Sequence, residues 1–435
     1  MSKRILVLGC YEHTLTIARS LARVGHQVIL GVTPEQLDQG YVHRSRFVAS
    51  TWQHPHIVDQ PADFDAALLD YLEDNSNTDA IFPVGEDDIR RLACIRNRLP
   101  CDVTVVMPGN EAVHRCLNKE SSNRLARACR VPTAGTRTVR TASELRQAIE
   151  ELGLPAIAKP AESTSLLLKK KCVFVRTADE LELLCRNWPA TESDIIVQNE
   201  IAGIRHNCDL VAENGKIEVY FEAEILRTDQ LDYAGNSVLD RSIPPTPLHR
   251  EFCERMVAAL NYTGLALFQF LRDPETGETC FLEVNPRSGA AISLAVGCGM
   301  NMPAAAVNAC SNEALNVDDQ YRFYQLRHCL HDDLQGLRKA RVYQEIDSRQ
   351  TLTWLGTICR DAIRADFFST LALKDIRPTL RIYWNMLLRL LRTNDRRTPG
   401  EAITRPIEAL DQDRLAIQST SASGVFRQID PTTEK

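Results

Sequence analysis

The sequence predicts an α/β unit followed by an α+β unit and a helical C-terminal extension. Three observations support this fold class: apolar runs alternate with helix-like segments in the N-terminal part, hairpin signals dominate the middle, and helical periodicity returns after residue 314. A length of 435 residues with 44% hydrophobic content suits about three domains with substantial cores. We expect domains at residues 1–112, 113–314 and 315–395, and a flexible tail at residues 396–435, which are rich in Thr, Ser, Asp and Pro.

The composition argues against several functional classes. The 51 basic and 57 acidic residues give a formal net charge of −6, so nothing global indicates a nucleic-acid partner and a small-molecule substrate is the better expectation. The 14 cysteines occur singly from Cys10 to Cys359 without a C-x-x-C pair, which favours reduced thiols in a cytoplasmic protein. No window approaches about 18 uninterrupted apolar residues, so neither secretion nor a membrane span is expected.

The N-terminal part begins with a strand, a helix and a second strand. The run RILVLG (4–9) is strand-like, and the apolar residues of TLTIARSLAR recur at helical spacing before Gly25 and the next apolar run. A dinucleotide fingerprint would need G-x-G-x-x-G at the first turn, but only Gly9 is present. We therefore favour a doubly wound domain without that cofactor, with a nicotinamide-dependent oxidoreductase as a weaker alternative.

The middle of the chain contains two near-copies of one helix-start signal, VRTASEL (139–145) and VRTADEL (175–181). In each, a Thr precedes a Glu by three residues, which is a capping box at the start of a helix. Strand candidates lie around them in LPAIAKP, CVFV and DIIVQNE. Asn214-Gly215 is a strong turn signal for a hairpin within CDLVAENGKIEVYFEAEI. These segments predict an α+β domain.

A second hairpin, LALFQFLR and ETCFLEVN around the turn DPETG, carries the most informative residues. Glu283 and Asn285 are two apart on a strand, so they project from one face and offer two hard oxygen donors of the kind Mg²⁺ accepts. A five-residue loop at 273–277 would place Phe281 opposite Gln269 and make Glu283 a diagonal neighbour of Gln269. A slip of one residue would move Gln269 to the other face.

Three basic residues accompany these strands: Lys119 in CLNKESSN, Lys159 at the end of PAIAKP, and Arg287 after Pro286. Taken one at a time, each has an ordinary explanation as a solvated or ion-paired charge. Isolated Glu and Asn residues on strands are also common. It is the order of all these motifs along the chain that points to a function.

In this order the motifs resemble those of the ATP-grasp enzymes. The resemblance spans roughly Met1 to Cys310 and rests on NKESSNRLARACRVPTAGT, LPAIAKP, IIVQNEIAG and FQFLRDPETGETCFLEVNPRSGAAISLAVGCG. The last block is the most specific and is similar to the carbamoyl-phosphate-synthetase-like branch, in which a Gln precedes Glu-x-Asn-Pro-Arg. The resemblance implies a Rossmann-like preATP-grasp domain followed by an ATP-grasp core.

The resemblance also implies roles for residues of this chain. Gln269, Glu283 and Asn285 would be the ligands of Mg²⁺, or of Mn²⁺ in its place. Arg287 would contact the γ-phosphate or an acyl phosphate, while Lys119 and Lys159 would hold the α- and β-phosphates of ATP, with Arg287 and Lys159 acting in catalysis. Further nucleotide contacts would come from Ser163, Thr164 and Ser165 near the phosphates and from Gln198, Asn199, Glu200 and Ile201 near adenine.

The activity implied is that of an ATP- and Mg²⁺-dependent carboxylate–amine ligase, which forms an amide through an acyl phosphate and releases ADP and phosphate in a biosynthetic pathway. A homodimer is left open, since many relatives are dimers. The chain holds one such core and no glutamine-hydrolysing module, which argues against a true carbamoyl phosphate synthetase. We expect acid-binding contacts from Arg227, Arg241 and Arg287, and other substrate contacts from ILRTDQLDYAGNSV (225–238).

Two departures from the family pattern keep an alternative open. The stretch AESTSLLLKKKCVFV contains no glycine where relatives have a glycine-rich phosphate loop, and Arg205 and His206 stand where many relatives place a ribose-binding Glu. The alternative is a nucleotide-binding or regulatory protein without turnover. In the C-terminal extension, a basic helical face with Arg381, Arg389 and Arg392 could rest on anionic lipid, but we favour a helix whose arginines lie in water, without membrane contact.

Overall fold

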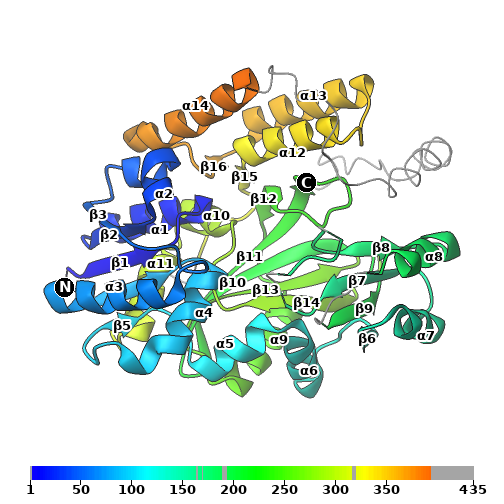
Figure 1. The fold of residues 1–435 in the computed structure, drawn as a ribbon, viewed down its shortest axis with the longest axis horizontal. Coiled ribbons are helices and arrows are strands. Elements are labelled where there is room, and N and C mark those ends of the chain that lie inside the picture. Colours follow the sequence, from blue (N-terminus) through cyan, green and yellow to red (C-terminus); the bar gives the residue numbers. More distant parts are fainter. Residues whose placement is uncertain (1, 163–164, 169, 189–193, 316–319, 393–435) are drawn as a thin grey trace. The chain divides into compact units, whose positions relative to one another are not determined.

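The computed structural model describes residues 2–162, 165–168, 170–188, 194–315 and 320–392 (Figure 1). Its N-terminal part is a five-stranded parallel sheet of order β3-β2-β1-β4-β5, formed by β1 (Arg4–Leu8), β2 (Gln27–Val32), β3 (Ser50–Gln53), β4 (Ala80–Pro83) and β5 (Thr104–Val105). The helices of this part are α1 (Glu12–Arg23), α2 (Pro34–Gln39), α3 (Pro61–Asp74) and α4 (Glu86–Ile95). Nearly all side chains of β1, β2 and β4 are buried, as expected for a parallel sheet covered on both faces, and the predicted α/β opening is confirmed.

A four-stranded antiparallel sheet of order β6-β9-β7-β8 follows, formed by β6 (Thr136–Val139), β7 (Ala156–Pro160), β8 (Val173–Val175) and β9 (Ile195–Asn199). Its flanking helices are α5 (Asn110–Leu117), α6 (Lys119–Ala128), α7 (Ala142–Leu152) and α8 (Ala178–Arg186). Thr141 and Thr177 are the N-caps of α7 and α8, and each accepts a hydrogen bond at 3.2 Å from the backbone N–H three residues later. Both predicted helix starts are therefore confirmed.

The largest sheet has seven strands in the order β14-β13-β10-β11-β12-β15-β16. They are β10 (Ile204–Glu213), β11 (Lys216–Thr228), β12 (Ser237–Ser242), β13 (Gly264–Arg272), β14 (Thr279–Asn285), β15 (Leu326–His328) and β16 (Phe367–Phe368). The accompanying helices are α9 (Pro247–Ala259), α10 (Ile292–Gly297) and α11 (Met302–Cys310). Asn214 and Gly215 adopt positive φ angles of 49° and 79° between β10 and β11, which confirms the predicted hairpin turn.

The predicted register of the β13–β14 hairpin is wrong, although Gln269 and Glu283 still lie on the same face of the sheet, as predicted. Arg272 pairs with Thr279, so the loop is one residue longer than expected, and the register shifts again between Gln269 and Phe270. Leu282 is the extra residue of this bulge. Because the longer loop alone would turn Gln269 to the other face, the bulge restores the parity and places Gln269 directly opposite Glu283.

The N-terminal sheet and the seven-stranded sheet share one hydrophobic core. Buried side chains from both sheets and from the helices between them form a single cluster, which includes Ile5, Val7, Ile17, Val211, Phe221, Leu294, Met302 and Val307. Helix α1 contacts both α10 and α11. This packing brings the first helix of the chain beside the segment that follows β14.

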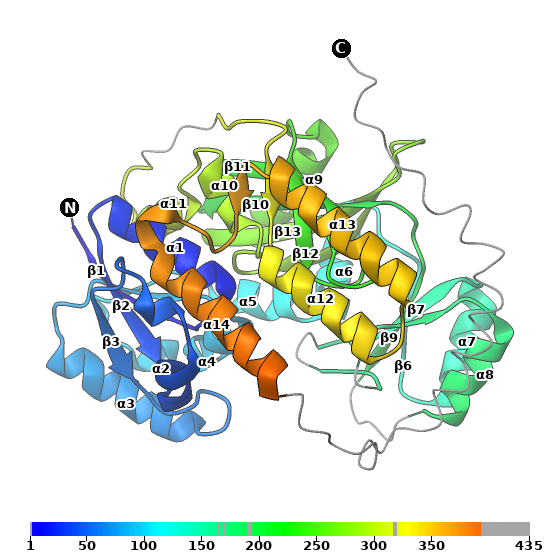
Figure 2. The same ribbon diagram turned by 90° about the horizontal axis from the view of Figure 1, so that it is seen from above.

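The C-terminal extension is mainly helical, as predicted, and also contributes two short strands. It contains α12 (Leu330–Val342), α13 (Ser348–Arg364) and α14 (Ile376–Arg392), and α12 and α13 lie side by side (Figure 2). The short strands β15 and β16 belong to the same region and extend the seven-stranded sheet. Strands of two and three residues are too short for a readable alternation pattern.

Residues 2–383 form one compact unit, and a second unit begins at Trp384. Arg381 donates a hydrogen bond to the carbonyl of Asp38 at 2.8 Å, whereas the side chains of Arg389 and Arg392 and the predicted tail lie outside the described residues. None of the helices in the described part of the chain is long and apolar enough to cross a membrane.

Candidate active site

Three oxygen-bearing side chains meet on adjacent strands of the large sheet. Asn285 Nδ2 donates a hydrogen bond to Glu283 Oε1 at 3.0 Å, and Gln269 Nε2 donates to Asn207 Oδ1 on β10 at 2.8 Å. The donor end of each amide is thus occupied, which leaves the amide oxygens of Gln269 and Asn285 beside the Glu283 carboxylate. Such a set of hard oxygen donors fits Mg²⁺ or Mn²⁺.

The two predicted lysines come together from different elements. Lys159 lies on β7 and is buried, with 9% of its surface exposed. Lys119 begins α6, and its Nζ donates to the carbonyl of Pro160 at 3.2 Å while its backbone N–H donates to that of Ala161 at 3.1 Å. The start of α6 is therefore tied to the end of β7, which holds the two ammonium groups near each other.

Three cationic side chains, Lys159, Lys119 and Arg287, influence the Glu283 carboxylate. Burial raises the pKa of Glu283, but the hydrogen bond from Asn285 and the charges of Lys159, Lys119 and Arg287 lower it more, so the pKa lies below its ordinary value. Burial lowers the pKa of both lysines, and Glu283 opposes that shift in each. One carboxylate thus faces three cationic side chains, an arrangement suited to a ligand that brings additional negative charge.

Arg287 extends this cationic group toward the N-terminus of α1. Its Nη1 donates to the carbonyl of Ser288 at 3.0 Å, while its buried Nε has no hydrogen-bond partner among the described residues. Burial, and then the charge of Arg287, lowers the pKa of His13 to about 3, so His13 is neutral at physiological pH. Arg287 thus keeps an unused donor, as does the Nε of Arg227.

The other two arginines proposed to bind an acid form ion pairs within the protein, and their role in binding an acid stays a prediction. Arg227 forms ion pairs with Asp333 and, at 2.8 Å, with Asp361. Arg241 donates to Glu224 at 2.6 Å. Their partners come from elements that the sequence alone could not place next to them.

Sequence reasoning missed two residues of β10 that share the face of Gln269. Asn207 lies directly opposite Gln269 and fixes its amide, and Asp209 is fully buried next to the turn that follows Pro286. Asp209 Oδ1 accepts from the backbone N–H of Gly289 at 3.5 Å, and its Oδ2 has no partner among the described residues. Burial raises the pKa of Asp209 to about 7, despite the opposing hydrogen bond from Gly289. The alternation of side chains along a strand could have identified both residues, because Asn207 and Asp209 are two apart on β10 and therefore share one face.

The remaining predicted nucleotide contacts are less informative. Ser163 and Thr164 lie outside the described residues, and the backbone N–H of Ser165 donates to Glu162 at 3.3 Å. The side chains of the β9 segment already have protein partners: Gln198 donates to Thr136, Asn199 to Leu152, and Glu200 forms an ion pair with Arg176. The backbone N–H groups of Asn199 and Glu200 donate to Gly135 at 3.1 Å and to Pro155 at 3.0 Å, so the contact of Gln198, Asn199, Glu200 and Ile201 with adenine stays a prediction.

Arg205 and His206, which stand where many relatives place a ribose-binding Glu, point to opposite faces of β10. Arg205 shares the face of Asn207, and both its Nη atoms donate to the carbonyl of Gly235 at 3.1 Å. His206 points to the other face, where it lies 3.0 Å from Glu222 in the core. His206 is thus a core residue rather than a member of this site.

Comparisons with known proteins agree with this architecture. No protein-family model matches the chain. It is 28% identical over 233 residues to D-alanine–D-alanine ligase A of Bradyrhizobium diazoefficiens, a match that covers 48% of this chain and 61% of the relative. It is 29% identical over 185 residues to the formate-dependent phosphoribosylglycinamide formyltransferase of Oleidesulfovibrio alaskensis, covering 41% of each. The matches thus span less than two thirds of either relative.

Solved structures share the fold at low sequence identity. The ADP complex of an N5-carboxyaminoimidazole ribonucleotide synthetase has a TM-score of 0.58 at 14% identity, covering 75% of this chain and 80% of that one. A biotin carboxylase from Campylobacter jejuni in complex with β,γ-ATP has a TM-score of 0.58 at 16% identity, covering 75% and 74%. Both curated relatives and both solved structures are ATP-grasp proteins. The chain thus shares the fold of these two structures and part of the sequence of the two curated enzymes, in agreement with the resemblance to the ATP-grasp enzymes.

Proposed function

We propose that this protein is an ATP- and Mg²⁺-dependent ligase that joins a carboxylate to an amine through an acyl phosphate and releases ADP and phosphate. The observation that carries the proposal is the meeting of Gln269, Glu283 and Asn285 with two lysines and Arg287. Phosphoryl transfer to a carboxylate requires mainly positioning and charge neutralisation, which these groups supply. The ligase named among the relatives and the nucleotides in the solved structures support the same reaction class.

In this proposal, the oxygen donors of Gln269, Glu283 and Asn285 hold Mg²⁺. The ion would neutralise phosphate charge and fix the phosphate geometry. Lys119 and Lys159 hold the α- and β-phosphates, and the free Nε of Arg287 donates to the transferred phosphoryl group.

The nucleophile in this reaction is the substrate's amine, so the protein needs no nucleophilic side chain of its own. The γ-phosphoryl group moves from ATP to the substrate carboxylate, which becomes an acyl phosphate, and ADP is left. The amine then attacks the acyl carbon, loses a proton and displaces phosphate, which leaves the amide. The protein acts by binding and orienting these groups.

The test is hydroxamate formation with Mg·ATP, hydroxylamine as a surrogate amine, and a panel of amino, keto and sugar acids. We expect one class of acid to give a hydroxamate together with ADP, and Glu283→Gln to abolish both products. Glu278→Gln, an exposed position on the same hairpin, is the matched control and should behave as the wild type.

A non-catalytic nucleotide-binding protein is the second candidate, favoured by the absence of glycine from residues 161–175. It predicts Mg·ATP binding, measured by calorimetry, with no ADP release for any acid and amine. That result would overturn the ligase proposal.

A further inference from the structure

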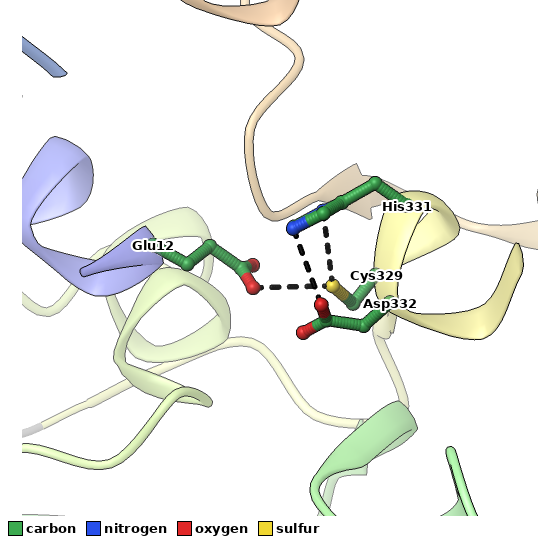
Figure 3. A group of neighbouring side chains, drawn as sticks. All are labelled: Glu12, Cys329, His331 and Asp332. Carbon is green, nitrogen blue, oxygen red and sulfur yellow. Dashed lines mark hydrogen bonds and ion pairs between the residues drawn. The ribbon is translucent and has the colours of Figure 1, made fainter. Parts of the chain in front are cut away.

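A second cluster of ligand-type side chains lies at the start of two helices that are far apart in sequence. Glu12 is the first residue of α1, Cys329 is the N-cap of α12, and His331 and Asp332 lie in the first turn of α12. Figure 3 shows the four side chains pointing toward one another. One potential ligand atom from each lies within 4.8 Å of the others.

The distances within this cluster suit a tetrahedral metal ion. Cys329 Sγ is 3.2 Å from Glu12 Oε2 and 3.6 Å from His331 Nδ1. Ligands bound about 2.0–2.3 Å from a tetrahedral zinc ion lie about 3.3–3.8 Å from one another. The separations of the sulfur from the carboxylate oxygen and from the ring nitrogen are therefore close to those between zinc ligands, and the oxygen and the nitrogen lie within 4.8 Å of each other.

The fourth side chain has the position of a supporting group. The other ring nitrogen of His331, Nε2, is 3.2 Å from Asp332 Oδ1. A histidine that binds a metal through one nitrogen commonly donates its other N–H to a carboxylate, which fixes the ring. The geometry thus separates three candidate ligands from Asp332, which orients one of them.

One atom of the cluster lacks a hydrogen-bond partner. Glu12 Oε1 is buried and has no hydrogen-bond partner among the described residues, and the Nη1 of Arg327 is 3.9 Å away. An acidic residue in the first turn of a helix is ordinary, since the helix dipole favours it there. That effect does not explain why a thiol, an imidazole and a carboxylate oxygen that has an ion-pair partner but no hydrogen bond lie together.

The other histidine–carboxylate cluster in the described chain shows the contrast. Glu222 Oε1 accepts from His206 at 3.0 Å and from His249 at 2.7 Å, and Glu222 Oε2 accepts from Tyr220 and from the backbone N–H of Thr246. Each oxygen of Glu222 is used twice. That cluster is a closed hydrogen-bond network, whereas Glu12 Oε1 accepts no hydrogen bond from the described residues and has only the ion pair with Arg327 at 3.9 Å.

We propose that Glu12, Cys329 and His331 bind a zinc ion, with Asp332 holding the His331 ring. The sulfur, nitrogen and oxygen donors favour Zn²⁺ over Mg²⁺, which prefers oxygen ligands alone. The ion would link α1, in the N-terminal domain, to α12, in the C-terminal extension. The site shares no residue with the proposed Mg²⁺ site, so its test does not depend on the proposed function.

The first experiment measures metal content on the full-length protein. After chelator treatment and addition of Zn²⁺, we expect one zinc per chain by mass spectrometry, and a thiolate-to-metal charge-transfer absorption when Co²⁺ replaces Zn²⁺. Cys329→Ser should abolish the absorption, and His331→Gln should release the metal. Cys116→Ser, a buried thiol outside the cluster, is the matched control and should keep both signals.

A second variant guards against misfolding, because Cys329 is only 1% exposed. Asp332→Asn should fold and bind Zn²⁺ about tenfold to a hundredfold more weakly, as expected when a supporting carboxylate is lost. Zinc should also raise the melting temperature of the wild type but not of His331→Gln. Absence of stoichiometric Zn²⁺ and Co²⁺ in the wild type, or full retention of metal by the Cys329 and His331 variants, would overturn the proposal.

Discussion

Two carboxylates of the large sheet, the buried Glu222 and the half-buried Glu283, are stabilised in different ways. Glu222 receives four hydrogen bonds from residues of the protein. Burial raises its pKa, but the hydrogen bonds from His206 and His249 lower it more, to about 2. Glu283 accepts one described hydrogen bond, from Asn285, and owes its lowered pKa also to three cations.

The comparison separates a residue that serves folding from one that serves a ligand. A carboxylate whose oxygens are all used by neighbouring donors has nothing left for a substrate or an ion. A carboxylate that is outnumbered by cations, beside free amide oxygens, remains able to bind. The predictions below would break or sharpen this contrast.

The largest expected effect is on stability. Glu222→Gln removes the charge that holds two histidines and places an amide donor against the N–H of Thr246, so unfolding should become easier by about 3–5 kcal/mol. Urea denaturation measures this change. Glu218→Gln on the same strand is the control, since its exposed pair with Lys216 should contribute no more than about 1 kcal/mol. Equal losses in both variants would contradict the assigned role.

The effect of Glu222 should also depend on pH. Its folded pKa lies below its unfolded value of 4.5, so its contribution to stability is complete above pH 4.5 and is lost as the pH falls toward about 2. The difference in unfolding free energy between wild type and Glu222→Gln should shrink over that range. A difference that stays constant down to pH 2 would show that the carboxylate charge is not involved.

In contrast to Glu222→Gln, Glu283→Gln should lower the activity and leave the stability nearly unchanged. Loss of the carboxylate should lower the rate of ADP release by at least about 100-fold, because an interaction with the charged groups of the reaction is removed. The melting temperature should change little. If Glu283→Gln lost as much stability as Glu222→Gln and kept its rate of ADP release, Glu283 would serve folding rather than ligand binding.

Lys159→Met should weaken Mg·ATP binding by about tenfold to a hundredfold without loss of stability. Lys159 is a buried cation whose charge is opposed by burial and by the like charge of Lys119, so its removal should cost the fold little. Calorimetric titration with Mg·ATP measures the affinity. The exposed Lys216→Met is the control, and equal affinity in both variants would remove Lys159 from the nucleotide site.

Asp209 should give an effect whose pH dependence is opposite to that of Glu222. Its pKa is raised from 3.8 to about 7, so the folded state holds a proton that the unfolded state releases, and its contribution to stability falls as the pH rises from 3.8 toward about 7. Asp209→Asn should therefore be more stable than the wild type at pH 8, with the difference disappearing below pH 4. A parallel pH profile for the two proteins would exclude a buried protonated Asp209.

Local signals in the sequence determined much of the framework. The capping threonines start α7 and α8, Asn214-Gly215 turns the β10–β11 hairpin, and a period of two places Glu283 and Asn285 on one face. These features depend on neighbours within a few residues, so the chain encodes them locally. The order of the same motifs was enough to predict the superfamily.

Only the tertiary structure decided which groups remain available. The bulge at Leu282, and not the loop length, sets Gln269 opposite Glu283. Arg227 is paired with acids more than 100 residues away, and Cys329 meets Glu12 across 317 residues. Whether a polar side chain is satisfied inside the protein or left for a ligand depends on partners brought by packing of distant elements, and no local pattern in a single sequence records those partners.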